Sequence, residues 1–187
     1  MSVSHILRWR AIDGWPGLEH AHISDRGDAI NVRSALIGAN DAKPFAVHYE
    51  LQIDPDWTVR QAFFQRMDGA TFALRSDGNG NWTEGDGTPR PDLSGCIDID
   101  ISRTPVTNTL PMRRLSWQPN VPQHLEMAWV ALDTFSVHRD GQIYTWLGDD
   151  RWRYEAADGS FEAIIVVDKD RLVVSYEGMF ERMGDTE

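Results

Sequence analysis

Hydrophobic and polar residues alternate along most of this chain with a period of two, which is the repeat of a β-strand. The alternation is clear where Val47, Tyr49 and Leu51 interleave with polar neighbours, and β-branched and aromatic residues dominate it. Segments of this kind, bounded by Gly, Asp, Asn or Pro, occupy residues 6–12, 18–24, 28–37, 45–53, 59–67, 71–75, 124–132, 134–139, 142–147, 151–156, 161–167 and 171–176. The pattern predicts an antiparallel sheet of a dozen or more strands.

The connections between these segments carry residues that favour tight turns. Asp-Gly pairs and neighbouring acidic residues accept left-handed backbone conformations, which hairpin turns require. Such turns are expected at Arg139-Asp140-Gly141, Asp149-Asp150, Asp158-Gly159 and Lys169-Asp170. The Gly- and Pro-rich stretch 77–91 contains no Gly-Lys-Ser/Thr and is expected to be a mobile surface loop without phosphate-binding chemistry.

Helix is scarce in this pattern. Residues 107–114 are the one helical candidate, with Thr107 or Asn108 as the N-cap and Pro111 near the first turn. Many strands carry bulky groups on both faces, so the sheet needs cover on each side. With 187 residues, residues 1–187 are expected to form a single mainly β domain, in which the sheet rolls over its own helix or a ligand.

The charge balance restricts the classes of partner. A formal net charge of -11 argues against nucleic acid, and also against docking on anionic lipid by charge. No apolar run is long enough for a membrane-spanning helix, and the N-terminus lacks the features of a secretory signal, which predicts a cytoplasmic protein. The sequence does not indicate an oligomeric state.

The metal and thiol chemistry of the chain is sparse. Cys96 is the only cysteine, so no internal disulfide or cysteine-based metal cluster can form. In a strand Cys96 would share a face with Asp98 and Asp100, and like charge would make its thiol a poor nucleophile. His20 and His22 have a metal-like spacing but no third ligand nearby, so no metal and no cofactor are expected.

The segment 93–115 concentrates the polar groups with the most chemical potential. Asp98 and Asp100 fall on one face of a strand, and Arg113 and Arg114 follow beyond two prolines. The carboxylates are suited either to acid–base or cation-binding work or to internal ion pairs with the arginines. The arginines could also bind an anionic head group, although an internal ion pair is the favoured interpretation.

Several motifs together resemble a known family. The stretches YELQIDPDWTVR (49–60), DGNGNW (77–82) and GCIDIDISRTPVTNTLPMRRL (95–115) occur in the order found in the bacterial family described as putative glycolipid-binding. The resemblance spans nearly the whole chain and implies a spiral β-roll, related in shape to periplasmic carriers that shelter the acyl chains of lipoproteins. It brings no established catalytic residues. Those carriers are exported, whereas this sequence shows no export signal.

Three classes of function follow. The first is a binding protein for a glycolipid or another amphiphile, without catalysis. The second is an enzyme acting on such a molecule through Asp98 and Asp100 with Arg113 or Arg114, and the third is a non-catalytic interaction module. The residues expected to contact a ligand are Tyr49, Trp57, Arg60, Asp98, Asp100, Asn108, Arg113, Arg114, Tyr144 and Tyr154.

Overall fold

The computed structural model describes residues 3–40 and 43–184. Within them the chain forms one 14-stranded sheet with little helix, so the mainly β prediction is confirmed. The strands are β1 (Val3–Ala11), β2 (Gly17–Asp25), β3 (Ile30–Asn40), β4 (Lys43–Ile53), β5 (Val59–Arg66), β6 (Thr71–Ser76), β7 (Trp82–Glu84), β8 (Asp98–Ile101), β9 (Pro122–Val130), β10 (Val137–Gly148), β11 (Arg151–Ala156), β12 (Glu162–Val167), β13 (Val173–Tyr176) and β14 (Phe180–Arg182).

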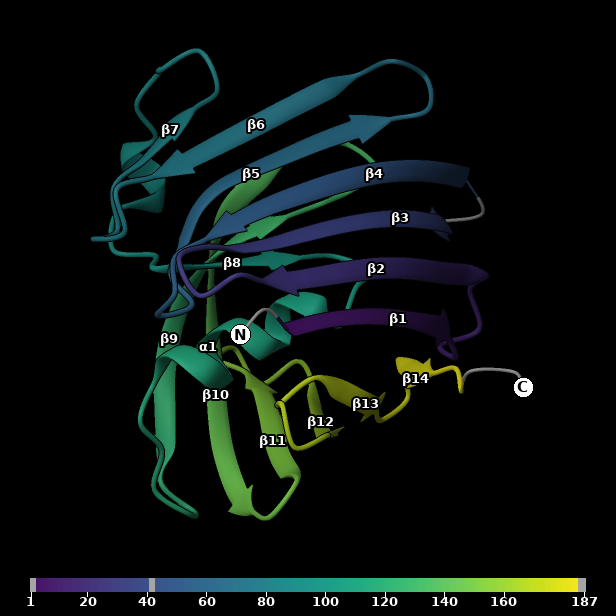
Figure 1. Ribbon diagram of the computed structural model, residues 1–187, viewed down its shortest axis with the longest axis vertical. Helices are drawn as coiled ribbons and strands as arrows, with labels where there is room; N and C mark the ends of the chain where they lie inside the picture. Colours follow the sequence, from purple (N-terminus) through teal and green to yellow (C-terminus); the bar gives the residue numbers. More distant parts are fainter. Residues whose placement is uncertain (1–2, 41–42, 185–187) are drawn as a thin grey trace.

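The order of the strands divides the sheet into two halves. One half runs from β7 to β1 and the other from β14 to β8, each with its strands in sequence order. The halves join through the first and last strands, where Trp9 pairs with Arg182 and Ala11 with Phe180. The sheet curls along this order, so that β8 and β9 come to lie behind the strands of the first half (Figure 1).

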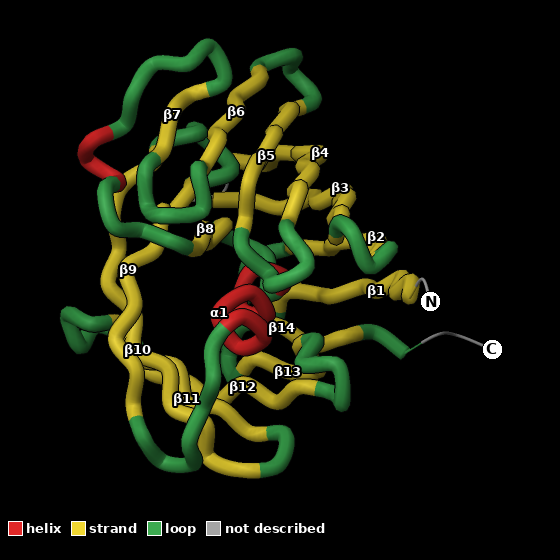
Figure 2. Tube along the Cα trace, turned by 60° about the vertical axis from the view of Figure 1, so that its left-hand side comes forward, coloured by secondary structure: helices red, strands yellow, loops and turns green. Residues whose placement is uncertain are grey.

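A short helical segment fills the middle of the curl. A 3₁₀ turn (Val106–Asn108) leads into α1 (Thr109–Arg114), and the arc of strands surrounds this helix (Figure 2). The helix is therefore where the sequence predicted it, inside a rolled sheet. The predicted side-chain cap is wrong, because neither Thr107 nor Asn108 caps the helix; both side chains bond to other elements.

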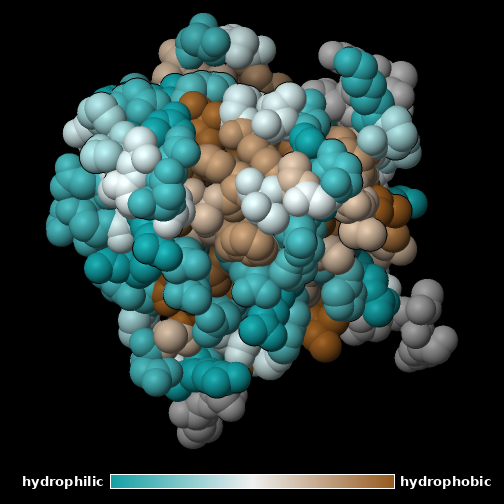
Figure 3. Space-filling model, turned by 90° about the horizontal axis from the view of Figure 1, so that it is seen from above, coloured by the Kyte–Doolittle hydropathy of each residue, from teal (hydrophilic) through white to brown (hydrophobic). Residues whose placement is uncertain are grey.

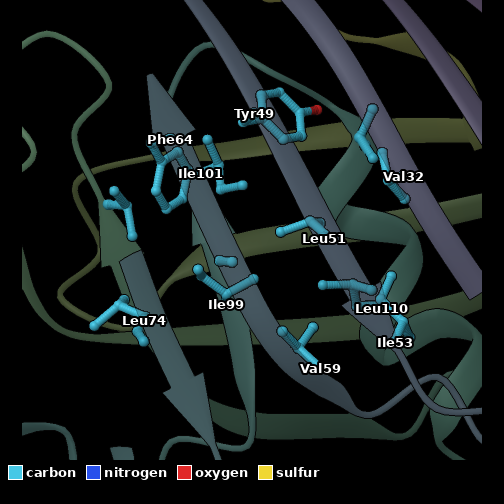
Figure 4. Packing of buried hydrophobic residues seen from close by; sticks show 14 of the residues in the cluster. Val32, Tyr49, Leu51, Ile53, Val59, Phe64, Leu74, Ile99, Ile101 and Leu110 are labelled. Atoms are coloured by element: carbon cyan, nitrogen blue, oxygen red, sulfur yellow. The ribbon is translucent and has the colours of Figure 1, made fainter. Parts of the chain in front are cut away.

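The core lies between the inner face of the first half and the strand β8. Tyr49, Leu51 and Phe64 from β4 and β5 point toward Ile99 and Ile101 of β8 (Figure 4). A second cluster, built around Tyr144, Trp152 and Ile165, fills the other half of the curl. Each buried Leu, Ile or Phe side chain in these clusters contributes about 1.5–3 kcal/mol by leaving water. Not all apolar surface is enclosed, since hydrophobic residues gather between hydrophilic margins on the face seen from above (Figure 3).

Three local predictions are wrong. The Asp140-Gly141 pair is not a turn but lies within the continuous strand β10, where a Cβ on Gly141 would approach that of Ala157 to 2.9 Å. The sheet is not wholly antiparallel, because β8 pairs with β9 in parallel. The stretch 77–91 is not a plain surface loop, because it contains β7, whose Trp82 is buried and donates to the Cys96 carbonyl oxygen at 2.7 Å.

Candidate ligand-binding pocket

An open pocket of about 460 Å³ lies where the ends of strands from both halves of the sheet meet. Phe45 of β4 contributes from the first half, and the ends of β8 and β9 form part of the wall. Further lining comes from the segment that follows β8, from β10 and β11, from the turn between β11 and β12, and from β13, β14 and the turn between them. Its volume falls in the range of small-molecule sites.

Aromatic rings form one continuous wall of this pocket. The ring of Tyr154 lies 6.0 Å from that of Phe161 and 5.8 Å from that of Tyr176, measured between centroids. Phe180 continues the row at 6.2 Å from Tyr176. Trp129 also lines the pocket, and its ring centroid lies 4.8 Å from that of His138. The wall provides apolar faces of the kind that stack on flat or ring-shaped ligands.

Two carboxylates bridged by one amide form the polar part. The Gln142 Nε2 donates to Asp100 Oδ2 at 2.7 Å and to Asp140 Oδ2 at 3.0 Å. The Thr107 hydroxyl donates to the other oxygen of Asp100 at 2.9 Å. Burial, opposed by the bonds from Gln142 and Thr107 and reinforced by the charge of Asp140, raises the pKa of Asp100 to about 6. Asp100 can therefore exchange a proton close to neutral pH.

A second buried carboxylate, Glu19, lies behind the pocket. Its Oε1 accepts hydrogen bonds from Ser34 and Tyr49, each at 2.6 Å, and its Oε2 accepts one from Thr104 at 2.6 Å. Thr104 also lines the pocket, next to Arg103. Burial raises the pKa of Glu19, although the three hydroxyl donors oppose this. The cluster fixes the segment that follows β8 against the inner face of β2–β4.

The backbone at the pocket rim takes a sparsely populated conformation. Arg103 has a φ of 67°, in the left-handed region, and its guanidinium forms an ion pair with Asp13 at 2.5 Å. A non-glycine residue in this region costs about 1–3 kcal/mol and persists where its surroundings hold it. The Arg103–Asp13 ion pair and the hydrogen bond from Thr104 to Glu19 keep the backbone of Arg103 in this conformation.

Of the ten residues predicted to contact a ligand, Asp100, Asn108 and Tyr154 line this pocket. Tyr144 lies directly behind them, since it accepts a hydrogen bond from Asn108 at 2.8 Å and its ring meets that of Tyr154 edge-on at 5.3 Å. Tyr49 belongs to the Glu19 cluster.

The remaining five predicted residues lie away from the pocket. Asp98 and Arg114 form the internal ion pair that their spacing left open as one interpretation, with Nη2 2.5 Å from Oδ2. The Arg113 guanidinium lies 4.4 Å above the Trp57 ring and donates to the Asp170 carbonyl oxygen at 2.6 Å. Arg60 pairs with Asp54 at 3.4 Å.

Sequence reasoning missed several residues of the pocket and of the cluster behind it. Asp140 was assigned to a turn, and this hid its place on the pocket-facing part of β10. Glu19 had a usable signal, because it lies in phase with Ala21 and Ile23, the inward side of β2. Aromatic pocket residues that were also missed are Trp129, Phe161, Tyr176 and Phe180, and Gln142, which bonds to Asp100 from behind the pocket, was missed as well.

The thiol and the histidine pair remain outside the pocket. Cys96 is fully buried, and burial is the main reason that its pKa rises to about 11; the charges of Asp98 and Asp100, given as the reason from the sequence, are not among the causes. His20 and His22 bond to Arg8 and Ser4. Within residues 3–40 and 43–184 no group of three metal-ligating side chains occurs.

The curled sheet and the enclosed helix define a β-roll protein, and the aromatic and acidic pocket at its rim is a candidate small-molecule site. The chain belongs to the family described as putative glycolipid-binding, which it matches over residues 6–182. It is similar to the crystal structure of a DUF1089 family protein from Pseudomonas aeruginosa, with 32% sequence identity and a TM-score of 0.80. That match covers 88% of this chain and 92% of the other. No curated protein matches the chain.

Proposed function

We propose that the protein binds an amphiphile with a sugar-bearing head group, and that the head group occupies the pocket lined by Asp100, Asp140 and Tyr154. The observation that carries this proposal is the juxtaposition of an aromatic wall with two bridged carboxylates in one open pocket. The family description agrees with it.

The chemistry of a sugar matches both parts of the pocket. The C–H face of a pyranose packs on rings such as Tyr154 and Phe161, and its hydroxyl groups donate to carboxylate oxygens. Asp100 and Asp140 are acceptors when ionised, so they select a ligand rich in donors. An anionic head group is disfavoured by the same charges.

The filled interior supports a position of the hydrocarbon part outside the roll. The interior is filled by the side chains around Phe64 and Ile99 and by α1, and the small, partly open pocket beside Glu19 amounts to only about 10 Å³. An acyl chain therefore extends from the pocket along apolar residues at its rim, such as Phe45 and Phe180.

Native mass spectrometry of the purified protein tests the proposal by revealing co-purified glycolipid. Phe161→Ala and Asp140→Asn are expected to lower occupancy, because each removes one half of the recognition chemistry. Asp150→Asn removes the same charge from an exposed position outside the pocket and serves as the matched control. Equal occupancy in all variants, or no bound lipid in any preparation, contradicts the proposal and favours an interaction module.

A second candidate function is hydrolysis of a glycosidic bond, and the raised pKa of Asp100 favours it. An acid with a pKa near 6 donates a proton at neutral pH, while Asp140 beside it stays available as the second carboxylate. Asp98 and Arg114 cannot take part in this reaction, because they are bound to each other in an internal ion pair. Chromogenic glycosides test this candidate: turnover that persists in Asp100→Asn, or none with wild type, counts against it.

A further inference from the structure

The outer face of β1–β4, which points away from the rolled core, presents an apolar row. Leu18 of β2 is paired with Ile37 of β3, Ile37 with Ala46 of β4, and Met67 donates its backbone N–H to Ala46. Residues opposite each other on neighbouring strands share a face, so these four side chains form one band across the sheet. The exposed fractions are 41% for Leu18, 56% for Ile37 and 82% for Met67.

Arginine and histidine side chains lie beside the apolar row. Arg8 and His20 pair on the next cross-strand row, and His22 and Arg33 on the row after that. Arg8 is exposed, and the Arg33 side chain is 70% exposed. Among the described residues of β1–β4 that point outward, Glu50 is the only carboxylate, and Arg33 and His48 share it at 3.5 and 3.6 Å.

This distribution is unusual for the chain as a whole. The protein has a net charge of -11, with 29 acidic against 18 basic residues, yet this face carries arginines and histidines around exposed aliphatic side chains. From the total charge we expected no docking on anionic lipid. The total charge does not reveal that arginines outnumber carboxylates on this one face. A shallow depression of about 380 Å³ runs between Leu18, His48 and Met67.

We propose that the outer face of β1–β4 docks on an anionic lipid bilayer. The aliphatic row enters the boundary between head groups and acyl chains, while Arg8 and Arg33 contact lipid phosphates. The acidic remainder of the protein is repelled by the same bilayer, so that only this face can approach it.

Other partners fit this face less well. A second copy placed symmetrically would bring Arg8 and Arg33 against another set of the same cations, which is unfavourable. Nucleic acid would match the cations but leave Ile37 and Met67 exposed to water or phosphate.

The docking face adjoins the candidate ligand pocket. Phe45 lines that pocket and also a groove shared with Leu18 and Ile37. A bilayer under this face therefore lies next to the pocket rim. The docking proposal does not depend on the pocket's ligand, because its residues and its test are separate.

Sedimentation with phosphatidylcholine vesicles, with and without phosphatidylglycerol, tests the proposal. The wild type is expected to bind the anionic vesicles and to be released by high salt. The Arg8→Gln/Arg33→Gln double variant is expected to bind about 30-fold more weakly, because a cation near an anionic surface contributes about 1 kcal/mol. Ile37→Ser and Met67→Ser are expected to weaken binding at low salt as well, because they remove the aliphatic contacts.

Two matched controls remove the same kinds of side chain, cationic and aliphatic, from surfaces outside the proposed docking face. Arg151→Gln/Lys169→Gln removes two exposed cations from the other half of the sheet, and Val121→Ser removes an exposed aliphatic side chain. Binding in these variants should equal that of wild type. All substituted positions are exposed, so circular dichroism should show an unchanged fold.

Three results would overturn the proposal. The first is no sedimentation of the wild type with anionic vesicles at low salt. The second is an equal loss of binding in the control variants. The third is a wild-type dimer by light scattering that Ile37→Ser dissociates, with no vesicle binding, since the face is then an interface between two copies.

Discussion

The carboxylate of Asp98 and the guanidinium of Arg114 form a two-point ion pair inside the roll, with Nε 3.0 Å from Oδ1 and Nη2 2.5 Å from Oδ2. The Asp98 side chain is 1% exposed and that of Arg114 is 16% exposed. The pair links the first residue of β8 to the last residue of α1, and so holds the enclosed helix against the sheet.

Asp98→Asn is expected to lower the free energy of unfolding by about 3–5 kcal/mol, because it leaves the Arg114 charge largely buried without its partner. Urea denaturation measures this change. Glu181→Gln is the control, since it breaks the exposed pair with Arg10 and should cost about 0.2–1 kcal/mol. Similar costs for both substitutions would mean that Asp98 is not a structural anchor.

Asp100 should make the protein less stable as the pH rises from about 4 to about 6. Its ordinary pKa is 3.8 and its folded-state pKa is about 6, so in this window the folded protein holds a proton that the unfolded chain releases. Across this window the free energy of unfolding falls by about 2–3 kcal/mol. Above it, Asp100 causes no further change in stability. The difference between the unfolding free energies of wild type and Asp100→Asn should show this slope; a difference independent of pH would contradict the raised pKa.

Tyr49→Phe is expected to cost about 1–3 kcal/mol of stability, because Glu19 loses one of its hydroxyl donors in a buried site. The loss should also raise the pKa of Glu19 further, since the Tyr49 bond is among the interactions that lower it. Tyr154→Phe, at the pocket wall, serves as the control for removing a tyrosine hydroxyl. Denaturation curves that coincide for wild type and Tyr49→Phe would exclude a structural role for the cluster.

Cys96 should react slowly with a disulfide reagent in the native protein and rapidly in denaturant. The thiol is fully buried, and its pKa of about 11 leaves little thiolate at neutral pH. Cys96→Ser is expected to leave ligand binding unchanged. Native labelling as fast as that of the denatured protein would show that the thiol is accessible.

Much of the fold could be predicted from local patterns. Strand alternation places Tyr49 and Leu51 on the inner face of β4 as expected, and Pro111 marks the one helix. Prediction failed where a distant partner decides the outcome. Asp140-Gly141 has turn chemistry, but pairing with β9 and the hydrogen bond from the Ala157 backbone N–H to the Gly141 carbonyl oxygen keep β10 continuous there.

The site was harder to predict because it joins residues that are distant in the sequence. Asp100 was a candidate from its own strand, but its bridge to Asp140 depends on β9, which pairs with both β8 and β10 and brings them into register. Their spacing alone could not show that Asp98 and Asp100 have different roles. Asp98 forms an ion pair with Arg114, whereas Asp100 faces the pocket.

The pairing of β1 with β14 has a consequence for how the protein forms during synthesis. The first half of the sheet can assemble as soon as β7 leaves the ribosome, yet the edge of β1 around Trp9 and Arg10 stays open until Phe180 and Arg182 arrive. An open edge strand invites pairing with other chains. Linking the ends of β1 and β14 and opening the chain between β7 and β8 would keep every strand next to its present neighbours in the sheet. It would also place the strands in sequence order along the whole sheet, and the resulting mostly local contacts favour faster folding.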